Sequence, residues 1–425
     1  MNHADHTILA PLIRGLCINA AGRPRVVIPE AAGGVPSPQA LTIDLSSAWN
    51  NNQFDEAAAA KVLNEAYAAW EFEMAPAGAE AAAKPELVKK QPSCIAVKIE
   101  GKIEAVYWID RDLDSAELRK KEQNAAFLEE DLPPAAATGI APAEARADRR
   151  SDVVRNRTAL VTGGAQGFGE EIVRGLAASG ALVYVADLNA EGAEKLAAKI
   201  NAAEKRTAAI AVPVNVAEEA SVEALFNTIA RTTGGLDLCV SNAGVLKAGS
   251  VLEQDLEAFK FVTDINYTGF FIVSKYAGKL LRLQQRTALN WKTDIIQINS
   301  KSGLEGSNKN GAYAGGKFGS LGLVESFALE LVAYNIKVNA VCPGNFLDGP
   351  LWSDPEKGLF VQYLNAGKVP GARTTADVKA YYESKVPMNR GCAGADVMRA
   401  IYYVVEQEYE TGQAVPVTGG QVMLH

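Results

Sequence analysis

Apolar and polar positions alternate regularly from about residue 157 to the carboxyl end of the chain. Short apolar runs typical of buried strands are separated by longer segments whose apolar positions recur at helical spacing. The predicted strands cover residues 158–162, 181–188, 207–216, 236–240, 295–298, 336–341 and 413–417. The predicted helices cover residues 190–203, 217–232 and 256–283, with one more ending near Gly180 and another carrying Tyr313. Such units imply parallel strands covered on both faces, so we expect an α/β fold with a doubly wound, parallel, seven-stranded Rossmann sheet.

The first 150 residues have a different pattern. Residues 25–28 are a short apolar run typical of a strand, and residues 54–72 carry apolar side chains at helical spacing. Residues 94–110 alternate around Glu100-Gly101, which predicts a hairpin. Residues 117–130 are charged and favour a helix. The Pro- and Ala-rich stretch that follows has no periodic apolar face, which is typical of a linker.

These patterns divide the chain into three parts. We predict a small amino-terminal α+β module over residues 1–131, a linker over residues 132–154 and the Rossmann domain over residues 155–425. No catalytic constellation stands out in the module. It is either an independent unit or an extension that completes the main domain.

A glycine-rich turn, Thr162-Gly163-x-x-x-Gly167-x-Gly169, follows the first predicted strand of the domain and opens a helix. Glycine allows the backbone to approach a pyrophosphate, and the N–H groups of the helix start face the anion. The turn therefore predicts a dinucleotide site, in which Gln166 and Phe168 also contact the cofactor.

Asp187 ends the next strand, about twenty residues further on, where a carboxylate can accept both hydroxyls of an adenosine ribose. It would repel a 2′-phosphate, and Gln166 is not basic, so we expect NAD rather than NADP. Further cofactor contacts are expected at strand ends, namely Leu188, Asn215, Val216, Asn242, Ala243 and Gly244.

Ser300, Tyr313 and Lys317 form a candidate catalytic set. Tyr313 and Lys317 are four residues apart, so one helix would place them on the same face. A free tyrosine has a pKa of about 10, and a nearby ammonium favours the phenolate. We therefore expect Tyr313 to move a proton and Ser300 to hold the substrate oxygen.

Composition narrows the possible functions. The chain has 425 residues, of which 48% are hydrophobic and 22% are charged, as in a globular protein with a large core. A net charge of −8 gives no electrostatic reason to expect nucleic acid or an anionic membrane. No apolar run reaches the roughly 18 residues of a membrane span, and the amino terminus does not have the pattern of a secretory signal.

Cysteine and histidine usage adds two expectations. The five cysteines are scattered, which favours a reduced, cytoplasmic protein. The only histidines are His3, His6 and His425, all at the chain ends, so we expect neither a Ser-His-Asp triad nor a metal site.

The motifs together resemble those of the short-chain dehydrogenase/reductase family in order and spacing. The matching positions are residues 162–169, the Asn-Ala-Gly at 242–244, Asn266, Ser300, Tyr313, Lys317 and Pro343-Gly344. The resemblance covers about residues 155–425 and implies that Tyr313 is the acid/base and that Ser300 orients the substrate. It further implies that Lys317 binds the nicotinamide ribose and lowers the pKa of Tyr313, and that Asn266 holds a water of a proton relay.

This sequence departs from the family pattern at two places. Asn215-Val216 replaces the usual Asp-Val, and a threonine common after the Pro-Gly pair is absent, with Asp348 nearby. The resemblance still implies nicotinamide contacts from Pro343, Gly344 and Asn345.

Residues 295–303, 306–319, 344–352, 381–392 and 417–423 are similar to one subgroup, the sorbitol-6-phosphate 2-dehydrogenases. That similarity implies NAD-dependent conversion of a polyol phosphate to fructose 6-phosphate, and the family implies a homotetramer. A phosphate needs cationic or N–H partners, for which Lys309 and Lys385 are candidates beside the expected substrate contacts. These contacts are Lys247, Ser300, Lys301, Ser302, Tyr313 and Arg390.

The expected reaction is hydride transfer from a secondary alcohol to the nicotinamide, with Tyr313 taking the hydroxyl proton. Three alternatives remain: the same chemistry on an unphosphorylated polyol or sugar, an NAD-binding regulatory protein, and a second activity or partner site in residues 1–150.

Overall fold

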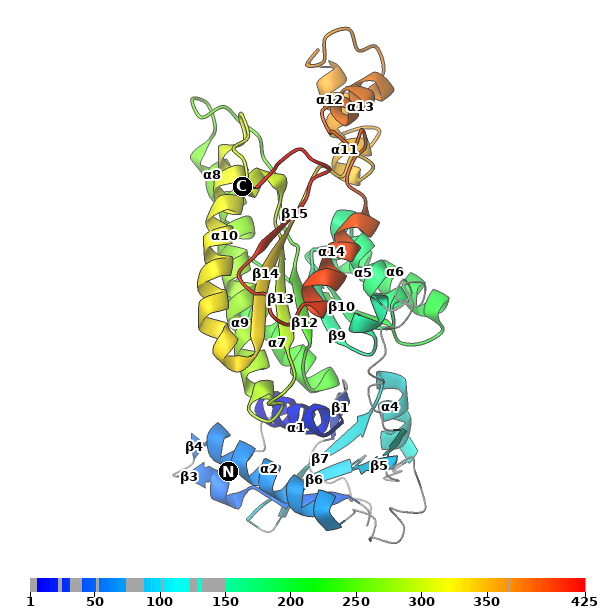
Figure 1. Cartoon of the computed structure of the whole chain (residues 1–425), viewed down its shortest axis with the longest axis vertical. Coiled ribbons are helices and arrows are strands. Elements are labelled where there is room, and N and C mark those ends of the chain that lie inside the picture. The colour runs from blue at the N-terminus through cyan, green and yellow to red at the C-terminus, as the bar shows by residue number, and fades with distance from the viewer. Residues whose placement is uncertain are drawn as a thin grey trace.

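The structure is a computed structural model that describes residues 6–21, 25–30, 40–50, 53–73, 88–92, 94–100, 102–122, 128–131, 150–365 and 367–424. Its central feature is a seven-stranded sheet in the order β11-β10-β9-β12-β13-β14-β15, with every neighbouring pair parallel (Figure 1). The strands are β9 (Thr158–Thr162), β10 (Leu182–Asp187), β11 (Ala209–Pro213), β12 (Leu238–Ser241), β13 (Thr293–Ile298), β14 (Ile336–Pro343) and β15 (Ala414–Val417). The predicted fold class and all seven strands are confirmed. The order reverses between β9 and β12, the point at which sheets of this type bind ligands.

Helices cover both faces of this sheet (Figure 1). One face packs on α5 (Gly167–Ala178), α6 (Ala190–Glu204) and α14 (Gly394–Glu406). The other packs on α7 (Glu219–Thr233), α9 (Gly269–Gln285) and α10 (Gly311–Leu331). Because both faces are covered, the strands are largely apolar, although β13 carries Asp294 and Gln297 and β14 carries Lys337 and Asn339.

The long helix predicted over residues 256–283 is confirmed, with an irregularity near its middle. It consists of α8 (Leu256–Thr263), the π-helical turn η4 (Asp264–Thr268) and α9. Asn266 lies in that turn. Single π turns inside α-helices are frequent at functional sites, because they re-aim a side chain.

Three short helices between β14 and α14 were not predicted. They are α11 (Pro350–Ser353), α12 (Leu359–Asn365) and α13 (Thr375–Ser384), and they extend beyond the carboxyl ends of the strands (Figure 1). They share a small aromatic core in which the ring of Trp352 contacts Phe360, Tyr363 and Tyr382. Thr374 and Asp377 form a capping box that starts α13.

The amino-terminal region has its own four-stranded sheet in the order β1-β7-β6-β2. Its strands are β1 (Val26–Glu30), β2 (Leu41–Asp44), β6 (Cys94–Ile99) and β7 (Lys102–Asp110). The strand predicted at residues 25–28, the hairpin at 94–110 and the helix at 54–72, which is α2 (Glu56–Glu73), are confirmed. Shorter elements complete the region: η1 (Ser46–Ala48), β3 (Trp49–Asn50), β4 (Gln53–Phe54), β5 (Val88–Gln91) and β8 (Leu128–Asp131).

The helix predicted over residues 117–130 is wrong at its carboxyl end, because α4 spans Leu113–Glu122 and residues 128–131 pair with β5. The predicted linker lies mostly outside the described residues, and Ser151–Val154 forms the 3-10 turn η3.

A helix that the pattern did not reveal, α1 (His6–Ala21), lies between the two sheets (Figure 1). One hydrophobic core contains Leu12 and Ile13 of α1, Tyr107 of β7 and Leu283 of α9. The small sheet therefore packs, through α1, on the Rossmann sheet at the edge formed by the amino ends of its strands.

Candidate active site

The glycine-rich turn after β9 has the shape that a pyrophosphate requires. Gly163 has φ +62°, and a Cβ there would lie 2.8 Å from Ala243 Cα. A Cβ on Gly169 would overlap the carbonyl oxygen of Gly163. Gly167, with φ +60°, has no atom within 4 Å of its Cβ position, so open space lies at the start of α5. Gln166 makes no side-chain cap there, which leaves helix N–H groups for an anion.

Hydrogen bonds join this turn to the loop that follows β12. The Thr162 hydroxyl accepts from the backbone N–H groups of Asn242 and Ala243, each at 3.1 Å. The Asn242 amide donates to the carbonyl oxygens of Thr162 and Gly163, each at 3.0 Å. Four of the expected cofactor residues therefore meet where the strand order reverses, with Gly244 directly beyond them.

Asp187 lies at the carboxyl end of β10, beside the turn. One carboxylate oxygen accepts from Ala165 N and the other from Asn189 N, each at 2.9 Å. Each oxygen keeps lone-pair capacity, so the group can still accept from ribose hydroxyls. Leu188 is exposed beside it.

Asn215 and Val216 follow β11 and have different surroundings. The Asn215 amide donates to Glu218 at 2.8 Å, and its oxygen accepts from Ala217 N at 3.1 Å, so it organises the start of α7. Val216 is buried against the position of Gly269 at the start of α9.

The catalytic candidates come together at the carboxyl ends of β13 and β14. Ser300 immediately precedes the 3-10 turn η5 (Lys301–Gly303), and its hydroxyl is near enough to Tyr313 for hydrogen bonding to lower the pKa of that phenol. Tyr313 and Lys317 both lie on α10, and Lys317 Nζ is 5.7 Å from the centroid of the Tyr313 ring. Lys317 is buried, and its Nζ donates to Ile298 O at 2.8 Å. The structure thus brings the three residues into one cluster.

The pKa values in this cluster depart from the sequence expectation. Burial raises the pKa of Tyr313 above its usual value, and the hydrogen bond with Ser300 opposes that rise. Burial also lowers the pKa of Lys317 to about 8. The expected lowering of the Tyr313 pKa is therefore not found in the protein alone, because desolvation outweighs the favourable neighbours.

Asn266 spans the gap between the π-helical turn and the loop after β12. Its side-chain oxygen accepts from Val245 N and its amide donates to Val245 O, both at 2.8 Å. A Cβ on Gly244 would lie 3.3 Å from the Asn266 oxygen and 3.8 Å from Lys317 Nζ. Asn266, Gly244 and Lys317 are thus neighbours, and the Asn266 oxygen has a second lone pair for a further donor.

Two residues of this site were not predicted. Asn299 is buried, its oxygen accepts from Ser300 N at 2.8 Å, and its amide donates to Lys317 O at 2.9 Å. It ties Ser300 to the helix of Lys317, and its position directly before Ser300 was the available signal. Phe346 stacks on Phe168 with ring centroids 4.5 Å apart, which brings the loop after β14 onto the cofactor turn.

The basic side chains that were expected to bind the substrate phosphate differ in their contacts. Lys247 Nζ lies 4.7 Å from the centroid of the Phe261 ring, and Lys385 Nζ lies equally far from the centroid of Tyr381. Arg390 donates to both oxygens of Asp396, at 2.6 and 3.0 Å. Lys309 is exposed on a turn with φ +55°. Lys301 is half-buried beside Ser300, and its side chain makes no hydrogen bond or ion pair to the described residues.

Ser302 is buried in the same turn, and its N–H donates to Ser300 Oγ at 3.1 Å. Pro343 ends β14, where the chain passes into Gly344 and Asn345. These two residues line a cavity of about 410 Å³ formed with the segments before α14 and after β15. Ser300, Tyr313 and Lys317 do not line that cavity, so it is separate from the catalytic cluster.

No group of three or more His, Cys, Asp or Glu side chains among the described residues could hold a metal ion. Among their helices, none combines the length and the apolar character that a bilayer crossing requires.

A parallel sheet with this strand order, a glycine-rich turn at its switch point and a Ser-Tyr-Lys cluster define the class of protein: the chain belongs to the short-chain dehydrogenase family. A family model described as short chain dehydrogenase matches residues 157–354. The chain is therefore an enzyme, an oxidoreductase of the type that uses a nicotinamide cofactor.

The chain is also similar to individual dehydrogenases of this family. The sorbitol-6-phosphate 2-dehydrogenase of Escherichia coli is 36% identical over 271 residues, which are 63% of this chain and 99% of that protein. The meso-2,3-butanediol dehydrogenase of Serratia marcescens is 28% identical, over 57% of this chain and 96% of that protein. The crystal structure of sorbitol-6-phosphate 2-dehydrogenase from Erwinia amylovora is similar at a TM-score of 0.57 and 39% identity, covering 63% of this chain and all of that one.

Proposed function

We propose that this enzyme interconverts sorbitol 6-phosphate and fructose 6-phosphate with NAD as hydride acceptor. The observation that carries the proposal is the cluster of Ser300, Tyr313 and Lys317, with Asn266 beside it, at the carboxyl edge of the sheet. The similarity to two sorbitol-6-phosphate 2-dehydrogenases supports the substrate class.

Each residue of the cluster has a distinct role. The Ser300 hydroxyl orients the substrate oxygen, and Tyr313 takes the proton of the alcohol. Lys317 hydrogen-bonds the nicotinamide ribose and adds positive charge near the phenol, which opposes the effect of burial on the Tyr313 pKa. Asn266 holds a water that links Lys317 to solvent. Bound nicotinamide accepts the hydride; the protein aligns it with the substrate carbon.

The preference for NAD follows from Asp187. Its carboxylate lies at the end of β10 beside the glycine-rich turn, and it would accept from both ribose hydroxyls. A 2′-phosphate there would face a negative charge with no basic residue in the turn to offset it.

Among the candidate cations, Lys301 is the best placed for the substrate phosphate. It adjoins Ser300, and its ammonium has no partner among the described residues, whereas Arg390 is paired with Asp396 and Lys247 lies over an aromatic ring. An ammonium free of other partners can meet a phosphate without first breaking an existing contact.

The assembly we propose is a homotetramer in the cytoplasm, as the family resemblance implies. Large apolar side chains on the face of α8 to α10 support association, because they are exposed on this single chain. They include Phe261, Phe271, Phe318 and Leu329. Light scattering on the purified protein gives the mass; a monomeric mass would contradict the proposal.

The test of the reaction is NADH formation by the purified protein with sorbitol 6-phosphate, sorbitol, mannitol and related polyols, each offered with NAD⁺ or NADP⁺. We expect turnover of the phosphate ester with NAD⁺. Lys301→Met should then raise KM for the phosphate ester while leaving cofactor affinity unchanged, with Lys199→Met, at an exposed position on α6, as the matched control.

Two other outcomes would change the assignment. Preference for a free polyol would keep the chemistry and remove the phosphate site. If none of these compounds is turned over although the protein binds NAD, the result would contradict the substrate class and favour a regulatory, NAD-binding role.

A further inference from the structure

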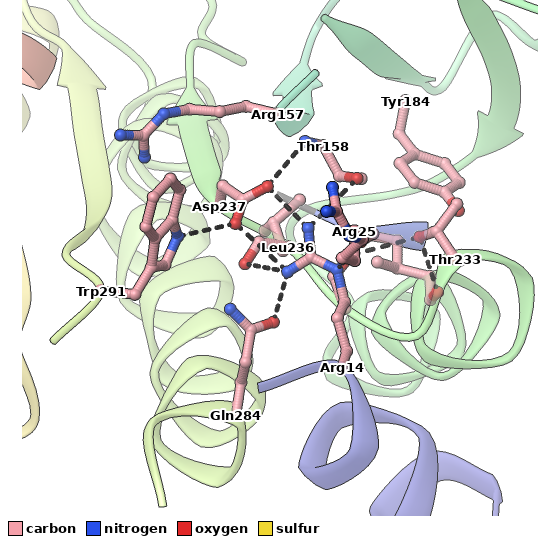
Figure 2. A network of polar contacts seen from close by, with 12 residues as sticks. Arg14, Arg25, Arg157, Thr158, Tyr184, Thr233, Leu236, Asp237, Gln284 and Trp291 are labelled. Atoms are coloured by element: carbon pink, nitrogen blue, oxygen red, sulfur yellow. Dashed lines mark hydrogen bonds and ion pairs between the residues drawn. The ribbon is translucent and has the colours of Figure 1, made fainter. Parts of the chain in front are cut away.

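A guanidinium from the amino-terminal helix lies completely buried against the Rossmann domain (Figure 2). Arg14 of α1 and Asp237, the residue before β12, both have 0% exposed side chains and form an ion pair at 2.7 Å. The same guanidinium donates to Gln284 Oε1 at 2.7 Å, and its Nε donates to Arg25 O at 2.7 Å. A buried charge is tolerated only when it is paired and hydrogen-bonded, as Arg14 is here.

Asp237 links that charge to the two central strands. It accepts from the backbone N–H of Thr158 at 2.8 Å and from Trp291 Nε1 at 3.0 Å (Figure 2). Its own N–H donates to Thr158 O at 2.8 Å. Burial alone would raise the pKa of Asp237, but the Arg14 charge holds it below the usual value, so the carboxylate is ionised. Thr158 is the first residue of β9. Arg14 and Asp237 therefore hold the amino ends of β9 and β12 together.

The carboxyl ends of the same two strands carry the cofactor residues. β9 has five residues and β12 has four, so each strand is only about 13 to 17 Å long. At the far end, Asn242 N donates to Thr162 Oγ1, which joins the glycine-rich turn to the Asn-Ala-Gly loop. A shift of one strand along the other at the Arg14 end would displace these partners, because strands this short move as rigid units.

Contacts from α1 to α9 reinforce this coupling. The Thr287 hydroxyl donates to Leu12 O at 2.6 Å, and a Cβ on Gly15 would overlap Gln284 O. Gln284 lies in the last turn of α9, and the first turn of α9 follows the π-helical segment that carries Asn266. The helix that presents Asn266 is therefore held at its other end by Arg14.

We propose that Arg14 is a positioning residue for the cofactor site, acting through Asp237 on the relative placement of β9 and β12. The inference rests on the proposed function, since it takes the turn after β9 as the dinucleotide site. It gives the amino-terminal region a role in a reaction whose other residues all lie in the dehydrogenase domain. The sorbitol-6-phosphate 2-dehydrogenase of Escherichia coli matches only 63% of this chain.

The experiment measures NADH binding and thermal unfolding for the full-length protein and three variants. Arg14→Lys keeps the charge but loses the forked hydrogen bonds, Arg14→Met removes the charge, and Asp237→Asn removes the counter-charge with little change in shape. The matched control is Asp114→Ala. It breaks another contact between the module and the domain, in which Asp114 accepts from Thr207 N at 2.9 Å and from Thr207 Oγ1 at 2.6 Å.

We expect Arg14→Lys and Asp237→Asn to raise the Kd for NADH by about threefold to thirtyfold. Binding is measured well below the unfolding temperature of each variant, so that the protein is folded. Asp114→Ala should leave the Kd within about twofold of wild type, since small effects of that size are ordinary for surface contacts. If Arg14→Met does not fold, the other two variants decide the matter.

Two results would overturn the inference alone: variants of Arg14 and Asp237 that unfold earlier yet bind NADH normally, or a control that weakens binding equally. The first result would mean that Arg14 only stabilises the fold. The second would mean that any weakened contact between the amino-terminal region and the dehydrogenase domain lowers NADH affinity. A wild-type protein that binds no dinucleotide would overturn the proposed function together with this inference, so the two failures are distinguishable.

Discussion

At the residue scale, the acid/base assignment depends on one hydroxyl. The Ser300 hydroxyl opposes the rise in the Tyr313 pKa, and Lys317 Nζ lies 5.7 Å from the centroid of the Tyr313 ring. Tyr313→Phe should lower kcat by a factor on the order of 10² to 10⁴, the usual value of a general acid/base, because only the transferable proton is lost.

Steady-state kinetics together with NADH titration test this prediction. Cofactor affinity should stay near that of wild type, and Tyr334→Phe, in the 3-10 turn that follows α10, is the matched control. Full activity in the Tyr313 variant would refute the assignment.

The second prediction at this scale concerns Lys317 and pH. Burial lowers its pKa from 10.5 to about 8, so the unfolded chain binds more protons than the folded chain between these values. Stability contributed by this group therefore rises with pH across that window and is lost as pH falls toward 8. Lys317→Met removes the dependence, so the wild type should gain stability relative to the variant as pH rises.

Urea unfolding of both proteins on either side of about pH 8 measures the difference. If the stability difference between the two proteins is the same at both pH values, burial does not perturb the pKa of Lys317. Lys279, whose Nζ lies over the ring of Tyr276 on α9, offers a control as Lys279→Met.

At the scale of elements, the start of α5 depends on close packing between the helix and the turn. A Cβ on Gly169 would overlap Gly163 O and lie 2.7 Å from the Asn242 amide nitrogen. Gly169→Ala should therefore destabilise the protein by about 1–3 kcal/mol, as overpacking does, and weaken NADH binding by displacing the turn.

Gly322 on α10 is the matched control, because a Cβ there meets nothing within 4 Å. Gly322→Ala should be neutral or stabilising, by up to about 1 kcal/mol, since alanine restricts the unfolded chain. Denaturant unfolding measures the stability of both variants. Equal changes in the free energy of unfolding would show that the close packing at Gly169 does not matter for stability.

At the scale of the whole molecule, the amino-terminal region and the dehydrogenase domain share a core. Leu283 of α9 is buried among side chains of α1 and α2, and Glu56 of α2 forms an ion pair with Arg286 at 3.1 Å. Deleting residues 1–154 would expose this apolar surface and leave Asp237 without Arg14. The shortened protein should unfold at lower denaturant concentration than the full chain, or fail to accumulate in soluble form.

Urea unfolding followed by tryptophan fluorescence compares the two proteins. An unchanged midpoint after the deletion would mean that the region is an independent module. A single transition in the full chain is also expected, because a shared core couples the two parts.

The sequence by itself determined the Rossmann fold and singled out the candidate site residues. Glycine spacing, the strand-ending Asp187 and the Ser300, Tyr313 and Lys317 set are local patterns, each readable within about twenty residues. The hairpin at residues 94–110 was also readable, because alternation and a turn are local signals.

Only the tertiary structure decided what depends on burial. Helix α1 contains Pro11 and is buried on nearly all sides, so it shows no amphipathic period, and Arg14 looks like any surface arginine in the sequence. The raised pKa of Tyr313 likewise follows from desolvation, which no spacing reveals. Charge and proton affinity depend on what surrounds a side chain in three dimensions, and for Arg14 the counter-charge lies 223 residues further along the chain.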